Sequence, residues 1–343
     1  MAQRDLHLGI VGVGRIGAFH ARTLRETAHV ARLTVADADR SRAEQVATTL
    51  GVQAAESPEA LLEANLDAVV IATATPGHAP LLSLAARAGL PAFCEKPVAL
   101  ALEPLDAVID EVAAAETFVQ VGFQRRFDDG YRAARDAVAD GTVGNLLLLR
   151  AATHDPAPPA EEYIAESGGI FRDLHIHDFD AIRFVTGREI VEVYADGAVR
   201  ETPWFERHGD VDAAVAVVRL EGGMLGVVTG TRHDPRGYDV RLELFGADDS
   251  IAVGVDARTP LRSVEPGAGR TDDGYREFLD RFADAYRAEL AAFVETLLSG
   301  GESLCPLSDA RAALAVALAA DRSRATRRPV SIEEVTSAQA IAG

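Results

Sequence analysis

The spacing of the glycines at positions 12, 14 and 17 constrains this chain more than any other feature of its sequence. These glycines follow directly on the apolar run of residues 6–11, and residues 16–27 after them suit a helix. In such a turn the first glycine permits a sharp bend, the second lets a pyrophosphate approach the backbone, and the third lets the helix lie close to the sheet. The pattern predicts a dinucleotide-binding turn. Its predicted contacts are Gly12, Gly14, Arg15, Ile16 and Gly17.

An acidic residue follows at the end of a second apolar run, residues 33–37. A carboxylate in this place accepts hydrogen bonds from the ribose 2′-OH of NAD and repels the 2′-phosphate of NADP. Asp37 therefore predicts NAD as the cofactor, and Arg40 is a further predicted contact. Arg40 and Arg42 lie close enough in sequence to weaken the preference for NAD. The alternative is that Asp37 is a solvated acid that opens a turn.

Length and composition narrow the class of protein. A chain of 343 residues exceeds the usual size of one core, so two domains are expected. No apolar run approaches the roughly 18 residues of a membrane span, and the first strand begins too early for a signal peptide, so we expect a cytoplasmic protein. Cys94 and Cys305 form no zinc or disulfide pattern and suit buried positions. A net charge of −19 argues against nucleic acid or an anionic membrane as a partner.

Strands and helices alternate along the first third of the chain. Strands are expected at residues 68–72, 91–94 and 118–122, and helices at 40–50, 80–88 and 103–116. This alternation predicts a doubly wound parallel sheet, a Rossmann domain over residues 1–122. Ligands bind outside the carboxyl ends of such strands. The further predicted cofactor contacts at those ends are Ala72, Thr73, Thr75, Pro76, His78, Glu95 and Lys96.

Beyond residue 122 the pattern changes to mostly antiparallel strands. They are expected at residues 146–154, 190–199, 212–220, 223–231, 239–245 and 250–255. Helices on one side would make an α+β domain over residues 123–305 with an open sheet face, and such a face is commonly covered by a second subunit. We therefore expect a homo-oligomer, a dimer or tetramer. Residues 306–343 are expected to form a helix and tail that return to the first domain.

Polar groups suited to proton transfer are concentrated in residues 168–180. A single helix is expected from Asp173 to Gly187, which would place Asp173, His177 and Asp180 in one stripe away from its apolar face. An imidazole can remove a hydroxyl proton near neutral pH, and a neighbouring carboxylate can orient it. Oxidation of an alcohol needs this combination. The alternative is an ordinary ion pair on a helix surface.

Lys96 is the candidate partner from the first domain. It ends a predicted strand and precedes Pro97, which favours an extended backbone and an ammonium group directed toward the ligand. A cation there can stabilise the reacting oxygen as its proton leaves. The alternative is a solvated lysine in a loop.

These segments together resemble a known family. The glycine turn, Glu95-Lys96-Pro97 and Asp173-x-x-x-His177 occur in the order found in the Gfo/Idh/MocA oxidoreductases, and residues 122–128 and 175–180 resemble the inositol 2-dehydrogenase branch. The resemblance spans nearly the whole chain. It implies a Rossmann domain followed by an open-faced mixed sheet, assembled as dimers or tetramers.

The resemblance also implies roles for individual residues. Lys96 would contact the nicotinamide ribose and the substrate, His177 would accept the proton, and Asp173 would hold the substrate and His177 in register. The further substrate-pocket positions it implies are Arg126, His154, Asp180 and Tyr238. For three of these a structural alternative stays open: a surface salt bridge for Arg126, a capping role for His154, and packing under the sheet for Tyr238.

The expected activity is oxidation of a secondary alcohol of a cyclic polyol or sugar by NAD, without a metal. Myo-inositol, giving 2-keto-myo-inositol, is the leading substrate. Because pocket residues set the polyol and the motifs do not, another inositol isomer or an aldose of the glucose or galactose type is an alternative. A different class of protein, a regulator that binds NAD(P) without turnover, is the other alternative.

Overall fold

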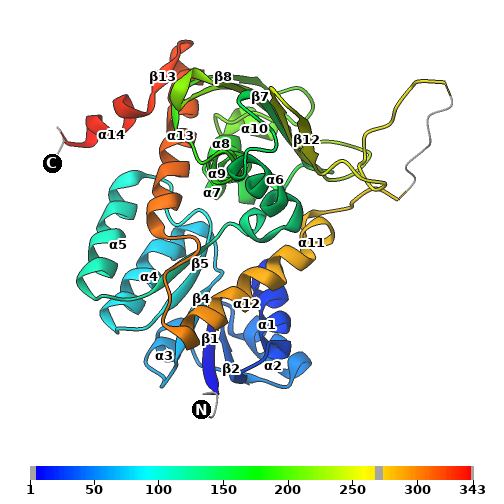
Figure 1. Cartoon of the computed structure of the whole chain (residues 1–343). Helices are drawn as coiled ribbons and strands as arrows, with labels where there is room; N and C mark the ends of the chain where they lie inside the picture. Colours follow the sequence, from blue (N-terminus) through cyan, green and yellow to red (C-terminus); the bar gives the residue numbers. More distant parts are fainter. Residues whose placement is uncertain (1–4, 267–272, 341–343) are drawn as a thin grey trace. The chain divides into compact units, whose positions relative to one another are not determined.

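The computed structural model describes residues 5–266 and 273–340, and within it the chain forms two compact units. The first unit comprises Met1–Gln124 and Asp284–Arg311, and the second comprises Arg125–Ala283 and Ala312–Gly343. Figure 1 colours the chain from blue at the N-terminus to red at the C-terminus, so both units contain two separate stretches of colour.

The first unit is built on a six-stranded parallel sheet with strand order β3-β2-β1-β4-β5-β6. Helices α1 and α2 lie on one side of this sheet and α4 and α5 on the other (Figure 1). The predicted doubly wound fold is therefore confirmed. The strands are β1 (Leu6–Val11), β2 (Val30–Ala36), β3 (Gln53–Ala54), β4 (Ala68–Ile71), β5 (Ala92–Glu95) and β6 (Val119–Gly122). The helices are α1 (Arg15–Glu26), α2 (Arg40–Leu50), α3 (Pro58–Leu62), α4 (His78–Arg87) and α5 (Leu102–Ala114).

Local sequence accounts for the ends of these elements. The Asp39 side chain accepts hydrogen bonds from the backbone N–H groups at the start of α2, and Gly51 ends that helix in the left-handed conformation, with φ of 66°. The central strands are fully buried because both faces of a parallel sheet are covered. The short strand β3 has no comparable apolar run and is not predicted by any sequence pattern.

The later part of the first unit comes from far along the chain. Helix α12 (Ala283–Ser299) contributes Leu290, Phe293 and Val294 to the core that includes Ile10 and Phe93. The ring centroids of Phe93 and Phe293 lie 5.8 Å apart, edge to face. Residues 284–311 rather than 306–343 therefore belong with the Rossmann sheet, which differs from the expected domain plan.

The C-terminal residues from Ala312 belong to the second unit. Helix α13 (Leu307–Thr326) is rich in alanine, which allows close packing, and the backbone N–H of Ala195 on β8 donates to Ser323 Oγ at 2.9 Å. This side-chain to backbone contact, spanning 128 residues of sequence, fixes the helix against the sheet. The apolar residues of 306–326 show no periodicity that would favour packing on one unit over the other. The sequence therefore does not predict that α13 packs on the second unit.

The second unit carries a seven-stranded mixed sheet with order β12-β11-β7-β10-β9-β8-β13. All six predicted strands are present, and β7 and β10 pair in parallel while the other neighbours are antiparallel. Only the two-residue β13 was not predicted. The strands are β7 (Leu146–His154), β8 (Ile190–Ala198), β9 (Ala213–Leu220), β10 (Leu225–Thr231), β11 (Asp239–Gly246), β12 (Ser250–Val253) and β13 (Val330–Ser331).

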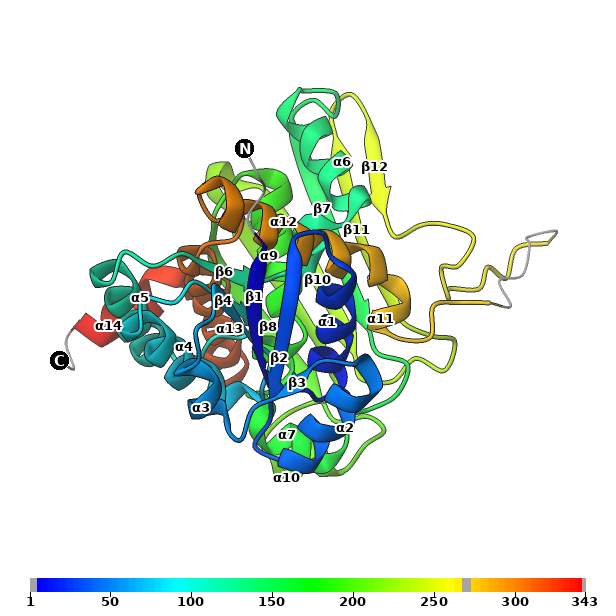
Figure 2. The same ribbon diagram turned by 90° about the horizontal axis from the view of Figure 1, so that it is seen from below.

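One face of this sheet is covered by helices and the other is open. Figure 2, seen from below, draws the sheet strands in green and yellow and the last helices in orange and red. Alternate residues of β9 are buried and exposed, as a sheet with one covered face requires. The exposed apolar residues of the open face include Leu148, Tyr194, Val215, Val217 and Leu225. The helices of this unit not yet named are α6 (Asp129–Ala139), α7 (Glu161–Ser167), α8 (Ile170–Asp173), α9 (Ile176–Thr186), α10 (Trp204–Arg207), α11 (Phe278–Arg281) and α14 (Ile332–Ala340).

Within the described ranges, no helix is both long enough and apolar enough to span a membrane. Cys94 and Cys305 are buried and free, as expected.

Candidate active site

The glycine turn of the first unit is shaped by steric necessity. A Cβ at Gly17 would lie 1.9 Å from the Gly12 carbonyl oxygen, and a Cβ at Gly12 would lie 2.6 Å from the backbone of Ala72. Gly12 also has φ of 88°, which disfavours any other residue. A Cβ at Gly14, by contrast, would meet no described atom within 4 Å. The turn is therefore tight against the sheet and open at Gly14, as the approach of a pyrophosphate requires.

The N-terminus of α1 lies beside this glycine turn, and we call the two together, residues 12–17, the nucleotide cradle. Gly14 is its N-cap, and no described side chain caps the first turn, so backbone N–H groups are available for phosphate oxygens. Arg15 is exposed and Ile16 is half-buried in that turn. The residues present therefore fit a dinucleotide.

Asp37 is tied to the glycine turn. Its carboxylate accepts hydrogen bonds from the backbone N–H of Val13 at 2.8 Å and of Asp39 at 2.9 Å, and it is only 7% exposed. The alternative of a solvated acid is therefore wrong. Arg42 also donates to Asp37, at 3.2 Å, whereas Arg40 pairs with Glu44. Of the two arginines, Arg42 is the one placed to moderate the charge of Asp37.

The loops after β4 and β5 are joined by His78. Its Nδ1 lies 2.8 Å from the Pro97 carbonyl oxygen and its Nε2 lies 2.9 Å from the Thr73 carbonyl oxygen. A neutral imidazole has one N–H, so it donates to only one of these oxygens at a time. Burial lowers the pKa of His78, which favours this neutral form. The geometry gives His78 a role in holding two loops together, and its contact with the cofactor stays a prediction.

Three of the other predicted residues of these loops are at least partly exposed, whereas Ala72 is buried. Thr73, Thr75 and Gly77 are half-buried and Pro76 is exposed, and Thr75–Gly77 forms a single short 3-10 turn before α4.

Glu95 is paired with a residue that sequence reasoning did not single out. Its Oε1 lies 2.6 Å from His20 Nε2, and both side chains are buried. The His20 ring contacts Phe93 and Tyr286 edge to face. The pair therefore joins α1 to the end of β5, where Lys96 follows, half-buried, with a cis peptide bond to Pro97.

In the second unit, the predicted single helix from Asp173 to Gly187 is wrong. Helix α8 ends at Asp173 and α9 starts at Ile176, because the His175 N–H bonds back to the Ile170 carbonyl and the His177 N–H to the Leu174 carbonyl, out of helical register. The residues between, Leu174 and His175, keep right-handed backbone angles. Asp173 is thus the last residue of one short helix, and His177 lies in the first turn of the next.

Asp173 is buried and held from two sides. Tyr163 Oη donates to its Oδ1 at 2.8 Å, and Arg232 Nη2 donates to its Oδ2 at 2.7 Å. Asp173 is 6% exposed and His177 is 9% exposed. The alternative of a helix-surface ion pair is therefore wrong.

Two adjacent arginines bind two acids of α9. Arg126 donates to both carboxylate oxygens of Asp180, at 2.9 and 2.6 Å, and Arg125 donates to Asp178 at 2.5 Å. All four side chains are buried, so the Arg126 pair is not a surface salt bridge. Burial opposes ionisation of Asp178, but Arg125 and His175 hold the pKa of this carboxyl below its usual value. Arg125 and Asp178 lie within residues 122–128 and 175–180, the segments that carry the family resemblance, but nothing in the sequence assigned them a role.

The remaining two predicted pocket residues lie elsewhere in the second unit. His154 projects from the open face of the sheet, where its Nδ1 lies 2.9 Å from Thr231 Oγ1, and burial lowers its pKa. It lines a hollow of about 400 Å³ with Val215 and Thr229. Tyr238 is 5% exposed and packs edge to face on Phe282, in line with the packing alternative. Their contact with substrate stays a prediction.

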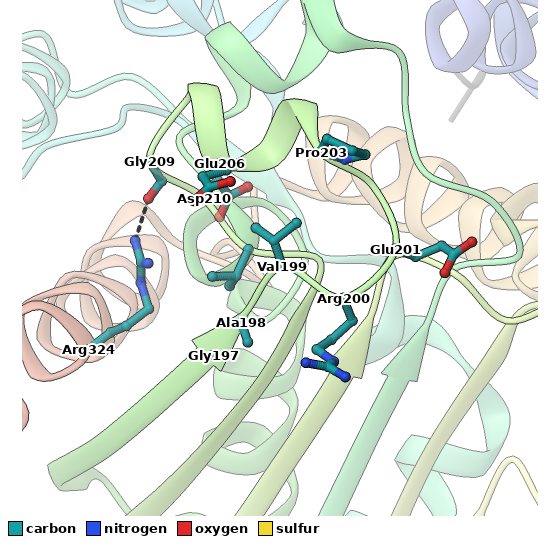
Figure 3. Close-up of a pocket in the computed structure, with 11 residues that line it drawn as sticks. Gly197, Ala198, Val199, Arg200, Glu201, Pro203, Glu206, Gly209, Asp210 and Arg324 are labelled. Atoms are coloured by element: carbon teal, nitrogen blue, oxygen red, sulfur yellow. Dashed lines mark hydrogen bonds between the residues drawn. The ribbon is translucent and has the colours of Figure 1, made fainter.

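A larger hollow, of about 520 Å³, lies beside the end of β8 (Figure 3). It is lined by residues 197–201, 203, 206, 209–211 and Arg324, none of which is a predicted site residue. Within the described ranges, no group of three or more His, Cys, Asp or Glu side chains is arranged to hold a metal ion.

Comparison with known proteins identifies the family. Residues 6–123 match the model of an oxidoreductase family with an NAD-binding Rossmann fold, and residues 131–252 match the Gfo/Idh/MocA C-terminal domain. The chain belongs to the Gfo/Idh/MocA oxidoreductase family. The resemblance seen in the sequence is thereby confirmed, and so is NAD as the dinucleotide of the first unit.

Individual relatives agree along nearly the whole chain. Myo-inositol 2-dehydrogenase of Thermotoga maritima is 38% identical over 336 residues, covering 96% of this chain and 99% of that protein. The NAD(+)-dependent scyllo-inositol 2-dehydrogenase of Bacillus subtilis is 35% identical and covers 96% of this chain and 97% of its own. The structure of scyllo-inositol dehydrogenase from Lactobacillus casei with bound NAD(H) and scyllo-inositol is 29% identical, with a TM-score of 0.88, covering 96% of this chain and 99% of that one.

Proposed function

We propose that this protein is an NAD-dependent dehydrogenase that oxidises a secondary alcohol of an inositol, with myo-inositol as the substrate and 2-keto-myo-inositol as the product. The supporting observation is that a chain matched over 96% of its length by an inositol dehydrogenase carries Lys96, Asp173 and His177, with the latter two buried. A regulator that only binds NAD would have no need to bury both an acid and an imidazole in this segment.

The first unit supplies the cofactor site in this proposal. The glycine turn and the N-terminus of α1 hold the pyrophosphate, and Asp37 faces the adenosine ribose. Bound NAD supplies the hydride acceptor. Glu95 and His78 fix the two loops that end beside Lys96.

The second unit supplies the base. His177 accepts the hydroxyl proton at a ring nitrogen as the carbinol C–H bond delivers its hydride, so that the alcohol loses two electrons and two hydrogens. Lys96 donates a hydrogen bond to the reacting oxygen, which stabilises the negative charge that develops there. Asp173 accepts a hydrogen bond from the substrate and keeps His177 in register.

A spectrophotometric assay at 340 nm against a panel of polyols tests the activity. We expect reduction of NAD with myo-inositol and a ketone product at one ring carbon. Tight binding of NAD without reduction by any polyol would favour the regulator instead. Higher kcat/KM with scyllo-inositol, or with glucose or galactose, would keep the reaction type and replace the substrate.

We further propose a homo-oligomer, a dimer or tetramer, formed through the open face of the second unit. Leu148, Val215 and Val217 on that face are between 38% and 47% exposed, which is unusual for aligned apolar side chains of one sheet. Light scattering should give a multiple of the chain mass, and Val217→Asp should reduce it; a monomer for the unmodified protein would refute the proposal. A cytoplasmic location stays part of the proposal, and the free buried cysteines agree with it.

A further inference from the structure

We propose that Arg232 and Tyr163 are positioning residues that fix the orientation of the Asp173 carboxylate for catalysis. The inference rests on the proposed function, because it assigns a purpose to the side chain that would hold substrate and His177 in register. No sequence motif pointed to either residue.

Arg232 is a buried guanidinium shared by two carboxylates. It follows β10 directly, is 3% exposed, and donates through Nη1 to Asp155 Oδ2 at 2.9 Å and through Nη2 to Asp173 Oδ2 at 2.7 Å. Its backbone N–H also bonds to the Asp212 carbonyl at 2.7 Å, which fixes the origin of the side chain. A planar guanidinium with two occupied arms fixes the position of one oxygen of each carboxylate. The ends of β7 and β10 thereby set the direction of Asp173.

Tyr163 holds the other oxygen from a different element. It lies on α7, and its hydroxyl donates to Asp173 Oδ1 while much of its ring is exposed. The Asp173 charge, together with burial of the hydroxyl, raises the pKa of Tyr163 well above its usual value, so the phenol remains a donor at neutral pH. With one donor on each oxygen, the carboxylate cannot rotate without breaking a bond.

The proposal gives Asp173 a contact with the substrate as well. An ionised carboxylate offers about four lone-pair sites, so an acid that accepts from Tyr163 and Arg232 can also accept from further donors. Fixing the acid before substrate arrives removes an ordering cost that would otherwise fall on the reaction. Loss of the fixing residues should therefore lower kcat more than it raises KM.

Charge also has a consequence for the pH profile. Without Arg232, Asp155 and Asp173 would lose the cation that both of them bind, and at least one would take up a proton more readily. The acidic limb of kcat/KM should then move to higher pH. A residue needed only for folding would not move this limb.

The test compares Arg232→Gln, Arg232→Lys and Tyr163→Phe with the unmodified enzyme and with Arg207→Gln. Arg207 bonds to Glu161 on the same helix α7 at the surface, so its variant is a matched control for disturbing α7. We expect kcat to fall roughly 10- to 100-fold in Arg232→Gln and about fivefold in Tyr163→Phe, with partial recovery in Arg232→Lys. NAD affinity should stay within about twofold in every variant, because the nucleotide cradle is built from first-unit residues.

Wild-type kcat and pH profile in a folded Arg232→Gln variant would overturn the inference. If that variant does not fold, Tyr163→Phe decides, since it removes one hydroxyl and keeps the ring; unchanged kcat there would be equally contrary. Failure of the proposed function would appear differently, as no turnover by the unmodified enzyme. Crystal structures of the unmodified protein and of Arg232→Gln test the positioning role without any substrate. We expect the Asp173 carboxylate to turn away from Tyr163 in the variant, and an unmoved carboxylate would refute the inference.

Discussion

The nucleotide cradle of the first unit and the carboxylate network of the second are built in opposite ways. The cradle uses backbone: glycines that exclude a Cβ, a helix N-terminus, and one acid bonded to the N–H of Val13. The network uses long side chains from distant segments, such as Arg232 with Asp173 and Arg126 with Asp180, which are 59 and 54 residues apart. The cradle therefore depends on residues close together in sequence, whereas the network is assembled by the fold.

The largest expected effect concerns the base. His177→Ala should reduce kcat by about 10³-fold, because proton transfer would lose its acceptor, while NAD affinity stays unchanged. Steady-state kinetics and a fluorescence titration with NAD measure the two quantities. His208→Ala is the control, since that imidazole pairs with Glu161 at the surface. An equal loss of cofactor affinity would show that His177 serves the cradle and would remove the contrast between the units.

A buried ion pair of the network should contribute more to the free energy of unfolding than an exposed ion pair does. Arg125→Met removes the cation from the buried Asp178, which should lower the free energy of unfolding by about 3–5 kcal/mol. Arg207→Gln, which breaks an exposed pair with Glu161, should cost less than about 1 kcal/mol. Denaturant unfolding of both variants provides the measurement. Equal losses would mean that burial of the pair is energetically irrelevant.

How far the sequence predicts each region follows from this contrast. The glycine turn, Asp37, and six strands of the second sheet could be located because each depends on a local spacing or alternation. The partners of Asp173 could not, because nothing local links an arginine after β10 and a tyrosine on α7 to that acid. The helix break between Asp173 and His177 escaped for a related reason: apolar periodicity continues across it, and only the hydrogen-bond register changes.

The sequence likewise does not predict which residues of the C-terminal third pack with which unit. Residues 283–299 fall within the range 123–305 expected for the second domain, but helix α12 packs on Phe93, and this contact arises only when the Rossmann sheet is formed. The two hollows of the second unit were not foreseen either, and only His154 connects one of them with a predicted residue.

Cofactor selection is the sharper test of the cradle. Asp37→Ser should weaken NAD binding by about tenfold and narrow the gap between NAD and NADP, because the carboxylate no longer repels a 2′-phosphate. Arg42, bonded to Asp37 in the native protein, would then be released toward that phosphate. The double variant Asp37→Ser with Arg42→Ala should lose the gain for NADP. An unchanged ratio of the two affinities in the single variant would refute the assignment of Asp37 to the ribose.

The smallest expected effect concerns His78. Its side chain lies between two backbone carbonyl groups, those of Thr73 and Pro97, in the loops after β4 and β5. Its pKa is lowered by burial from the ordinary value of 6.5, with Glu95 and Lys96 acting in opposite directions, so the folded protein resists protonation while the unfolded chain accepts it. Stability should therefore fall as pH drops below about 6.5, by at most about 1.4 kcal/mol per pH unit from this group.

His78→Gln removes the titration and retains one amide donor for a carbonyl oxygen. Unfolding measured between pH 7.5 and about 5 should show a shallower pH dependence in the variant than in the unmodified protein, since other titrating groups are common to both. A steeper dependence would mean that native His78 gains protons more readily than the unfolded chain does, and that it donates to both carbonyl oxygens as an imidazolium. The loops after β4 and β5 would then be held together by a charged side chain, as the segments of the carboxylate network are.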